Sequence, residues 1–423
     1  MPFFPCAHAG HPLWPYAVKQ VIVQLQAQVS MQKLEGKTPL GVVYVSATYA
    51  EHARDIVAML SQYLPDVQHW VGSAAHGVLA GDMDYGSSGA LAVMLPLVQE
   101  QDYRVFSGMV PWQSSVFSAR AALIHGDASS PQLAQQMHAL RQQLSGAELA
   151  GGLCELHSHH AQWSLGGVYE GAMPASIGGG GVQVGGFSGV AFAHQMECVL
   201  VGMQGCKPVG KSSTITQVDG DVVLQLDGRP ALEVFFADVD WTDVLSQTSP
   251  AHDAACAKVQ QSLMAMQPAG GAWNGNCVSE HAQVMQVVGV DPVRQGIVLS
   301  GLPKEGCDLM LCESDAMAMR ADMRRACAQL WEALTDTLVC TTSAVEAAAP
   351  HGRCIGGAIY IRNQNRHAQV RAPHIDSELQ LIRHALGPIP LLGFASSYEI
   401  DAGHLQHMSA QLLVFTQPLQ ALL

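Results

Sequence analysis

The sequence predicts an α/β protein of mixed (α+β) type, built as two mixed-sheet α/β halves with helices packed on the sheets. Three observations support this fold class. Apolar residues make up 48% of the chain, enough for packed cores. Near the N-terminus, runs typical of buried strands alternate with amphipathic helical patterns. A chain of 423 residues also exceeds the size of one ordinary core, so we expect two parts.

The first half is expected to begin near residue 14 with an α/β layer. Apolar residues three and four apart predict its helices, and β-branched apolar runs predict its buried strands. The expected elements are helix 14–32, strand 39–47, helix 49–64, strand 67–72, strand 89–95 and helix 131–144.

Residues 150–228 have a different sequence pattern, in which short runs of strand-forming residues alternate with glycines. This pattern predicts an antiparallel β-meander. Asp219 and Gly220 are typical of a tight hairpin turn. Pro230 suits the first turn of a following helix.

The second half is expected to follow a polar, turn-rich segment, TDVLSQTSPAHD, near residue 245. The predicted division is therefore 14–245 and 246–423, and no short tandem repeat is visible. The elements expected in the second half are helix 251–266, strands 277–289, 296–300 and 308–312, helix 314–335, strand 355–361, helix 375–386, and strands 389–394 and 411–416.

The net charge indicates which classes of partner are disfavoured, and the cysteines indicate the cellular compartment. The net charge of −14 disfavours nucleic acid and anionic membranes as partners. No apolar run reaches the roughly 18 residues of a spanning helix, and the N-terminus lacks the pattern of a secretory signal. The 11 cysteines are scattered without a C-x-x-C pair, which favours reduced thiols and a cytoplasmic location.

The segment GCKPVGKSST, residues 205–214, matches the phosphate-loop pattern G-x-x-x-x-G-K-[ST]. A phosphate loop needs a helix directly after the lysine, because the helix N-terminus supplies the amide donors that hold phosphate. Here the following residues, rich in Thr, Ile and Val, predict a strand and hairpin. We therefore expect a glycine-shaped bend between two strands and no nucleotide site.

The segment QGCKPVGKSSTITQVDGDVVLQLDGRPALEVF (204–235) resembles the central signature of the FIST domains, a family of sensory domains. The family's Gly-Cys-x-Pro-x-Gly turn, Thr-rich strand, hairpin and Asp-Gly-x-Pro-Ala helix start all have counterparts here. Residues 39–79 and 378–400 resemble the opening and closing parts of the family pattern. The two predicted halves would then be a FIST N-like and a FIST C-like domain.

The resemblance implies a small-molecule-binding sensory protein of intracellular signal transduction, with an amino acid or related metabolite as ligand. It implies no enzymatic activity and no cofactor. A downstream signalling protein on another chain would then be the partner. We expect the ligand where glycine-rich turns of the two halves converge. The predicted ligand-binding residues are Gly205, Cys206, Gly210, Phe394 and Glu399.

Two alternatives remain open from the residues alone. The first is a thiol- or metal-dependent enzyme that uses Cys206 as nucleophile, or His157 and His159 in the segment CELHSHH as metal ligands. The second is a non-catalytic protein-binding scaffold. Arg366 and Arg371 are further candidates, for a ligand carboxylate.

Overall fold

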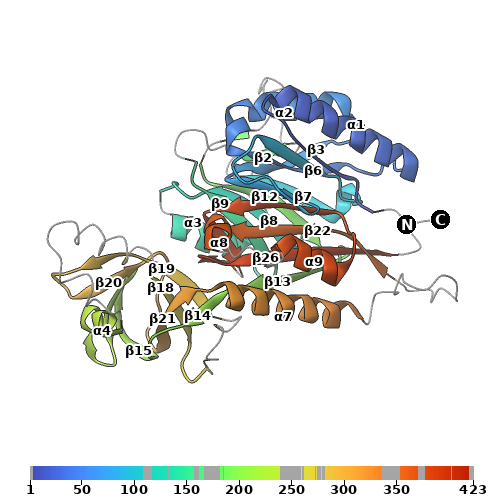
Figure 1. Ribbon diagram of the computed structural model, residues 1–423. Helices are drawn as coiled ribbons and strands as arrows, with labels where there is room; N and C mark the ends of the chain where they lie inside the picture. The colour runs from blue at the N-terminus through green and yellow to red at the C-terminus, as the bar shows by residue number, and fades with distance from the viewer. Residues whose placement is uncertain are drawn as a thin grey trace.

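The computed structural model shows three mixed sheets around a shared core, with a small β-barrel attached at one side (Figure 1). The structure describes residues 3–107, 117–131, 133–156, 162–165, 182–183, 185–238, 259, 262–271, 273, 278, 282–335, 353–369, 377–401 and 403–418.

The first sheet has six strands, and two helices cover one of its faces. Its elements are β1 (Cys6–Gly10), α1 (Trp14–Gln32), β2 (Leu40–Ser46), the 3-10 helix η1 (Ala47–His52), α2 (Ala53–Tyr63), β3 (His69–Ala75), β6 (Ala90–Met94), β10 (Gln162–Leu165) and β11 (Val182–Gln183). The strand order is β1-β6-β2-β3-β10-β11, and only β2 and β3 are parallel among these pairs.

The second sheet also has six strands, and one helix packs on it. Its elements are the 3-10 helix η2 (Glu100–Asp102), β7 (Tyr103–Ser107), β8 (Ala119–Asp127), α3 (Leu133–Gln143), β9 (Glu148–Cys154), β12 (Phe187–Ala193), β24 (Tyr398–Asp401) and β25 (His404–Gln406). The order is β7-β12-β8-β9-β24-β25, with β8 and β9 parallel and the other neighbours antiparallel.

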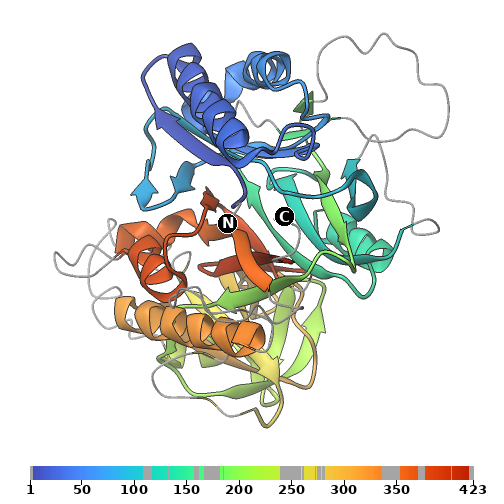
Figure 2. The same ribbon diagram turned by 90° about the vertical axis from the view of Figure 1, so that its right-hand side faces the viewer.

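The third sheet lies between the second sheet and a layer formed by α7 and α9 (Figures 1 and 2). Its elements are β4 (Gly77–Ala80), β5 (Met83–Asp84), β13 (Cys198–Met203), α7 (Ala316–Thr335), β22 (Arg353–Asn363), α8 (Gln364–Gln369), α9 (Glu378–Leu386), β23 (Leu391–Ser396) and β26 (Ala410–Pro418). The order is β13-β26-β22-β23-β4-β5, and β22 and β23 are its parallel pair.

The barrel occupies the chain between β13 and α7. Its elements are β14 (Cys206–Pro208), β15 (Ser213–Asp219), β16 (Val222–Leu226), β17 (Arg229–Pro230), α4 (Ala231–Asp238), β18 (Leu263–Pro268), β19 (Gln283–Asp291), β20 (Gly296–Leu299) and β21 (Cys307–Ser314). The order β21-β15-β16-β20-β19-β18 closes because β18 pairs with β21. Phe235 of α4 packs with the barrel's own apolar cluster.

The three sheets share one architecture. In each sheet, helix connects the two strands of the parallel pair: α2 in the first sheet, α3 in the second, and α8 with α9 in the third. An antiparallel hairpin lies beside the second strand of each pair. That hairpin always comes from another unit. The hairpin after β3 joins the third sheet, the hairpin after β9 joins the first, and the hairpin after β23 joins the second. Three units of the chain therefore exchange hairpins in a cycle.

A glycine occupies the same register position in the second strand of each parallel pair. Each stands opposite a residue whose carbonyl oxygen leaves no space for a side chain. The pairs, with the distance from a built Cβ to that oxygen, are Gly72 and Val43 (1.8 Å), Gly151 and Ile124 (2.1 Å), and Gly393 and Tyr360 (2.1 Å). The shared position supports the equivalence of the three units.

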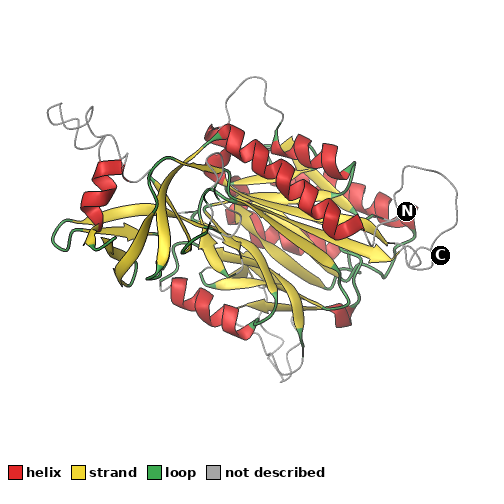
Figure 3. Ribbon diagram, turned by 90° about the horizontal axis from the view of Figure 1, so that it is seen from below, coloured by secondary structure: helices red, strands yellow, loops and turns green. Residues whose placement is uncertain are grey.

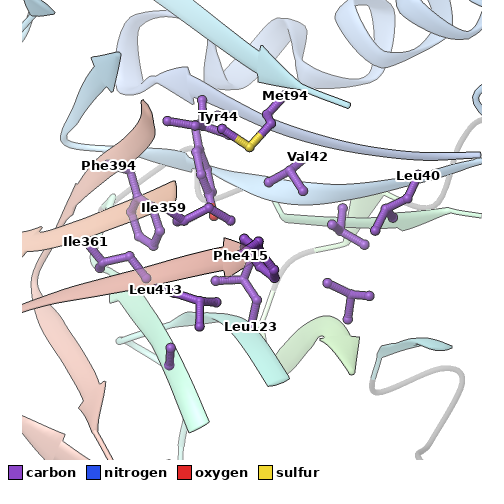
Figure 4. Close-up of a cluster of buried hydrophobic side chains, with 14 of the residues drawn as sticks. Leu40, Val42, Tyr44, Met94, Leu123, Ile359, Ile361, Phe394, Leu413 and Phe415 are labelled. Atoms are coloured by element: carbon purple, nitrogen blue, oxygen red, sulfur yellow. The ribbon is translucent and has the colours of Figure 1, made fainter. Parts of the chain in front are cut away.

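The central apolar core is built from all three sheets. Tyr44, Leu123, Ile361, Phe394 and Phe415 converge there from strands far apart in sequence (Figure 4). Helices lie outside the strands (Figure 3). The apolar stripes of the helices pack inward, as expected for layered α/β structures.

The predicted mixed α/β class is confirmed, as is the hairpin between β15 and β16, where Gly220 has a φ of 62°. The antiparallel meander predicted for residues 150–228 is wrong, because β9 and β12 lie in the second sheet, β10 and β11 in the first, and β13 in the third. The predicted helix 251–266 is wrong at its end, because residues 263–266 lie in β18. Met264 and Met266 face the barrel core, whereas Leu263 and Ala265 belong to a different cluster. Burial on both faces removed the alternation that identifies a strand. The boundary near residue 245 lies outside the described residues and stays a prediction.

Candidate functional site

Gly205 and Cys206 lie at the junction between β13 and β14. Gly205 has a φ of 69°, and a Cβ there would be 2.5 Å from Met319 and 2.7 Å from Arg366. Cys206 is fully buried, and its thiol lies 3.7 Å from the carbonyl oxygen of Gln204. This is a tight internal bend, in which only glycine fits at position 205.

Arg366 ties this bend to the third sheet. Its guanidinium is fully buried, donates to the carbonyl oxygens of Gln204 (3.0 Å) and Met408 (2.8 Å), and pairs with Glu378 at 2.7 Å. The charge is thus compensated inside the protein, as a buried ion requires. Arg371 lies outside the described residues.

Phe394 and Glu399 are also enclosed. The ring of Phe394 packs against Tyr44, with centroids 4.4 Å apart. The Glu399 carboxylate accepts hydrogen bonds from Ser396 Oγ (2.7 Å), Asn363 Nδ2 (3.2 Å), and Ser409 Oγ and N–H (2.8 and 3.1 Å). Burial raises the pKa of Glu399 to about 7, although these donors oppose the shift.

Gly210 lies apart from the other predicted residues, in a half-buried bend after β14. Its N–H donates to the carbonyl oxygen of Leu311. β15 then begins at Ser213, so an extended strand follows Lys211. The expectation that the phosphate-loop pattern is not followed by a helix is confirmed.

Of the five predicted residues, the structure brings Gly205 and Cys206 together, and a chain of contacts through Arg366, Met408 and Ser409 connects them to Glu399.

The enzyme alternative depends on Cys206 as nucleophile or on two histidines as metal ligands. Cys206 lies beside Cys312, and that contact, followed by burial, raises the pKa of the Cys312 thiol. His157 and His159 lie outside the described residues. Within the described ranges, His, Cys, Asp and Glu side chains form no group of three that could hold a metal ion.

An open groove of about 650 Å³ lies between the barrel and the three-sheet body. A second hollow of about 600 Å³ adjoins it and shares Leu200, Gly202 and Asp401. We call the two together the junction groove. Its polar and charged lining comes from α3 and the residues after it, β9, the barrel, α7 and β24–β25, and consists of His138, Arg141, Gln142, Ser145, Glu148, Gln267, Gln283, Lys304, Gln329, Asp401, His404 and Gln406.

The lining of the junction groove carries charges of both signs. Arg141 Nη1 lies 2.8 Å from His404 Nε2, and its stem covers Gly403. Burial, followed by the positive charges of Arg141 and Lys304, lowers the pKa of His404 to about 4. His404 is therefore neutral at pH 7 and accepts from Arg141. Asp401 lies on the same groove, beside the backbone of Gly202.

The groove therefore places cationic donors beside a carboxylate acceptor. Arg141 and Lys304 present N–H donors, and Asp401 presents a carboxylate. Sequence reasoning missed all of these residues, because Arg141, Lys304 and Asp401 lie far apart in the chain. The segment IDAGHLQH, residues 400–407, gave the only signal, a cluster of polar side chains around a glycine turn.

Comparisons with known proteins match most of the chain. Residues 39–229 match the FIST N domain, and residues 242–401 match the FIST C domain. Two uncharacterised proteins of Mycobacterium tuberculosis, from strains CDC 1551 and H37Rv, are each 26% identical over 237 residues, covering 53% of this chain and 51% of each relative. The chain thus spans about half the length of these curated relatives. Across the described residues, no helix has the length and apolar character needed to cross a membrane.

Proposed function

Because the chain belongs to the FIST family of sensory signal-transduction domains, we propose that it binds a small molecule, an amino acid or related metabolite, in the junction groove. The protein would act in intracellular signal transduction, in the cytoplasm, by binding its ligand without chemical conversion. Free cysteines, found throughout the described residues, suit that compartment.

The observation that carries this proposal is the charge pattern of the groove. Asp401 contributes a carboxylate, and Arg141 and Lys304 contribute cations, on walls that belong to different parts of the fold. An α-amino acid carries the complementary pair of charges on one carbon. The surrounding glutamines, Gln267, Gln283, Gln329 and Gln406, offer both donors and acceptors to a polar side chain.

The position of the groove connects binding to signalling. Its walls come from the barrel on one side and from β13, α7 and β24–β25 on the other. A ligand that contacts both walls would stabilise one arrangement of the barrel relative to the body. A signalling protein on another chain would then recognise that arrangement.

The proposal is tested by a thermal-shift screen with the twenty amino acids and their simple derivatives, followed by calorimetry. A ligand at a hundredfold excess over its Kd should stabilise the fold by about 2.7 kcal/mol. We expect Asp401→Asn and Lys304→Gln each to weaken binding at least tenfold.

The matched controls are Asp82→Asn and Lys211→Gln, which change exposed charges away from the groove. Both should bind as the wild type does. Binding that is unaffected by the groove substitutions would place the ligand elsewhere, and a screen without any stabilising amino acid or derivative would contradict the proposed ligand class.

A further inference from the structure

We propose that Ser397 is a nucleophilic serine, activated by His76, that reacts with esters of short carboxylic acids. The Oγ of Ser397 lies 2.8 Å from Nε2 of His76, and the backbone N–H of Glu155 donates to the same Oγ at 3.0 Å. None of these residues lines the junction groove, so this activity goes beyond the proposed sensory function.

The three residues come from the three equivalent units of the fold. His76 directly follows β3, Glu155 directly follows β9, and Ser397 directly follows β23. These strands are the second members of the three parallel pairs, so the pairs present their carboxyl ends at one place. The carboxyl ends of parallel strands are where α/β proteins place ligand and catalytic groups.

The backbone of Ser397 is fixed on both sides. Its N–H donates to the carbonyl oxygen of Leu153 at 2.7 Å, and its own carbonyl oxygen accepts from Asn363 Nδ2 at 2.8 Å. His407 also donates to the backbone of Ser397. The hydroxyl group is thereby held against His76, as a preorganised nucleophile requires.

The hydrogen bonds are compatible with proton transfer from Ser397 to His76. The N–H of Glu155 occupies one lone pair of the Ser397 oxygen, and in the tautomer with Nε2 unprotonated the hydroxyl proton lies on the 2.8 Å contact to that nitrogen. His76 then carries its own proton on Nδ1, the tautomer that a general base needs. The side chain of Ser397 is 6% exposed and His76 is half-buried, so only a small ester is expected to reach the hydroxyl group.

The reaction balances with water as the only co-reactant. Ser397 Oγ attacks the ester carbonyl, and its proton passes to Nε2 of His76. The carbon–oxygen bond to the alcohol breaks, and the alcohol leaves with that proton. Water, deprotonated by His76, then attacks the acyl-serine, which releases the carboxylic acid and restores Ser397.

The test is labelling of the full-length chain with an alkyl fluorophosphonate, located by peptide mass spectrometry, alongside hydrolysis of p-nitrophenyl acetate. We expect the label on Ser397. Ser397→Ala should abolish it, and His76→Gln should slow it roughly 100-fold, the scale of a general base. The control is His8→Gln, which removes another histidine–hydroxyl pair, His8 Nδ1 with Tyr85 at 2.7 Å, and should label normally.

A wild-type chain that is not labelled at Ser397, or an equal rate in folded His76→Gln, would overturn the proposal. Circular dichroism verifies that each variant is folded. Should His76→Gln fail to fold, Ser397→Cys gives an independent answer, because a thiol held against His76 should react with iodoacetamide much faster than free cysteine. A rate equal to that of free cysteine would also reject the proposal.

Discussion

At the scale of single residues, Gly393 shows how closely the parallel strands approach. Gly393→Ala would place a Cβ 2.1 Å from the carbonyl oxygen of Tyr360, so a backbone must move. We expect a loss of roughly 3 kcal/mol or more in the free energy of unfolding, measured by urea denaturation. Gly289→Ala is the control, because no atom lies within 4 Å of its built Cβ. Similar losses in both variants would contradict this explanation.

Glu399 makes a pH-dependent contribution to stability. Its pKa rises from 4.5 to about 7 on folding, so the folded state binds the proton more tightly. The contribution is therefore complete below about pH 4.5 and is lost as the pH rises through about 7. Relative to Glu399→Gln, the stability of the wild type should fall by roughly 3 kcal/mol from pH 4.5 to 8.

Chemical denaturation of both proteins across this pH range measures that difference. His404 and His407, whose pKa values are lowered to about 4 by burial, are present in both proteins, so their opposite effect cancels in the comparison. A difference that does not change with pH would show that Glu399 does not titrate in this range.

At the scale of elements, α9 begins with a complete capping box. Ser377 Oγ accepts from the N–H of Gln380 at 3.2 Å, and the Gln380 side chain accepts from the N–H of Ser377 at 2.9 Å. Ser377→Ala should lower the unfolding free energy by about 1 kcal/mol, measured by thermal denaturation. Ser30→Ala, at an exposed position inside α1, should have little effect. An equal loss in the two variants would argue against the cap.

The sequence predicted most helices and central strands, because their apolar periodicity directly reflects one buried face. Prediction from the sequence failed where burial does not give a periodic apolar pattern. β18 is buried on both sides, so its run Leu263–Met266 lacks the alternation of a strand and resembles the end of a helix. The short hairpins β4–β5 and β24–β25 carry no periodic signal, and their partners lie hundreds of residues away. The junction groove was missed for the same reason, since its charges meet only after the barrel docks on the body.

At the scale of the whole molecule, strands from both predicted halves share sheets. Without residues 246–423, the second sheet would lose β24 and β25, and the third would keep only β13, β4 and β5. We expect the isolated segment 14–245 not to unfold cooperatively, as judged by circular dichroism and calorimetry. Co-expression with 246–423 should restore a cooperative transition. A sharp transition of 14–245 alone would instead support two independently folding domains.

The cyclic exchange of hairpins has a consequence for how this protein is made. β26, the last described strand, lies between β13 and β22 near the centre of its sheet, so the third sheet is incomplete until residues 410–418 have been synthesised. Apolar edges of earlier strands stay unpaired for that whole time. Nascent chains should therefore depend on ribosome-associated chaperones, and rapid synthesis without them should yield aggregates.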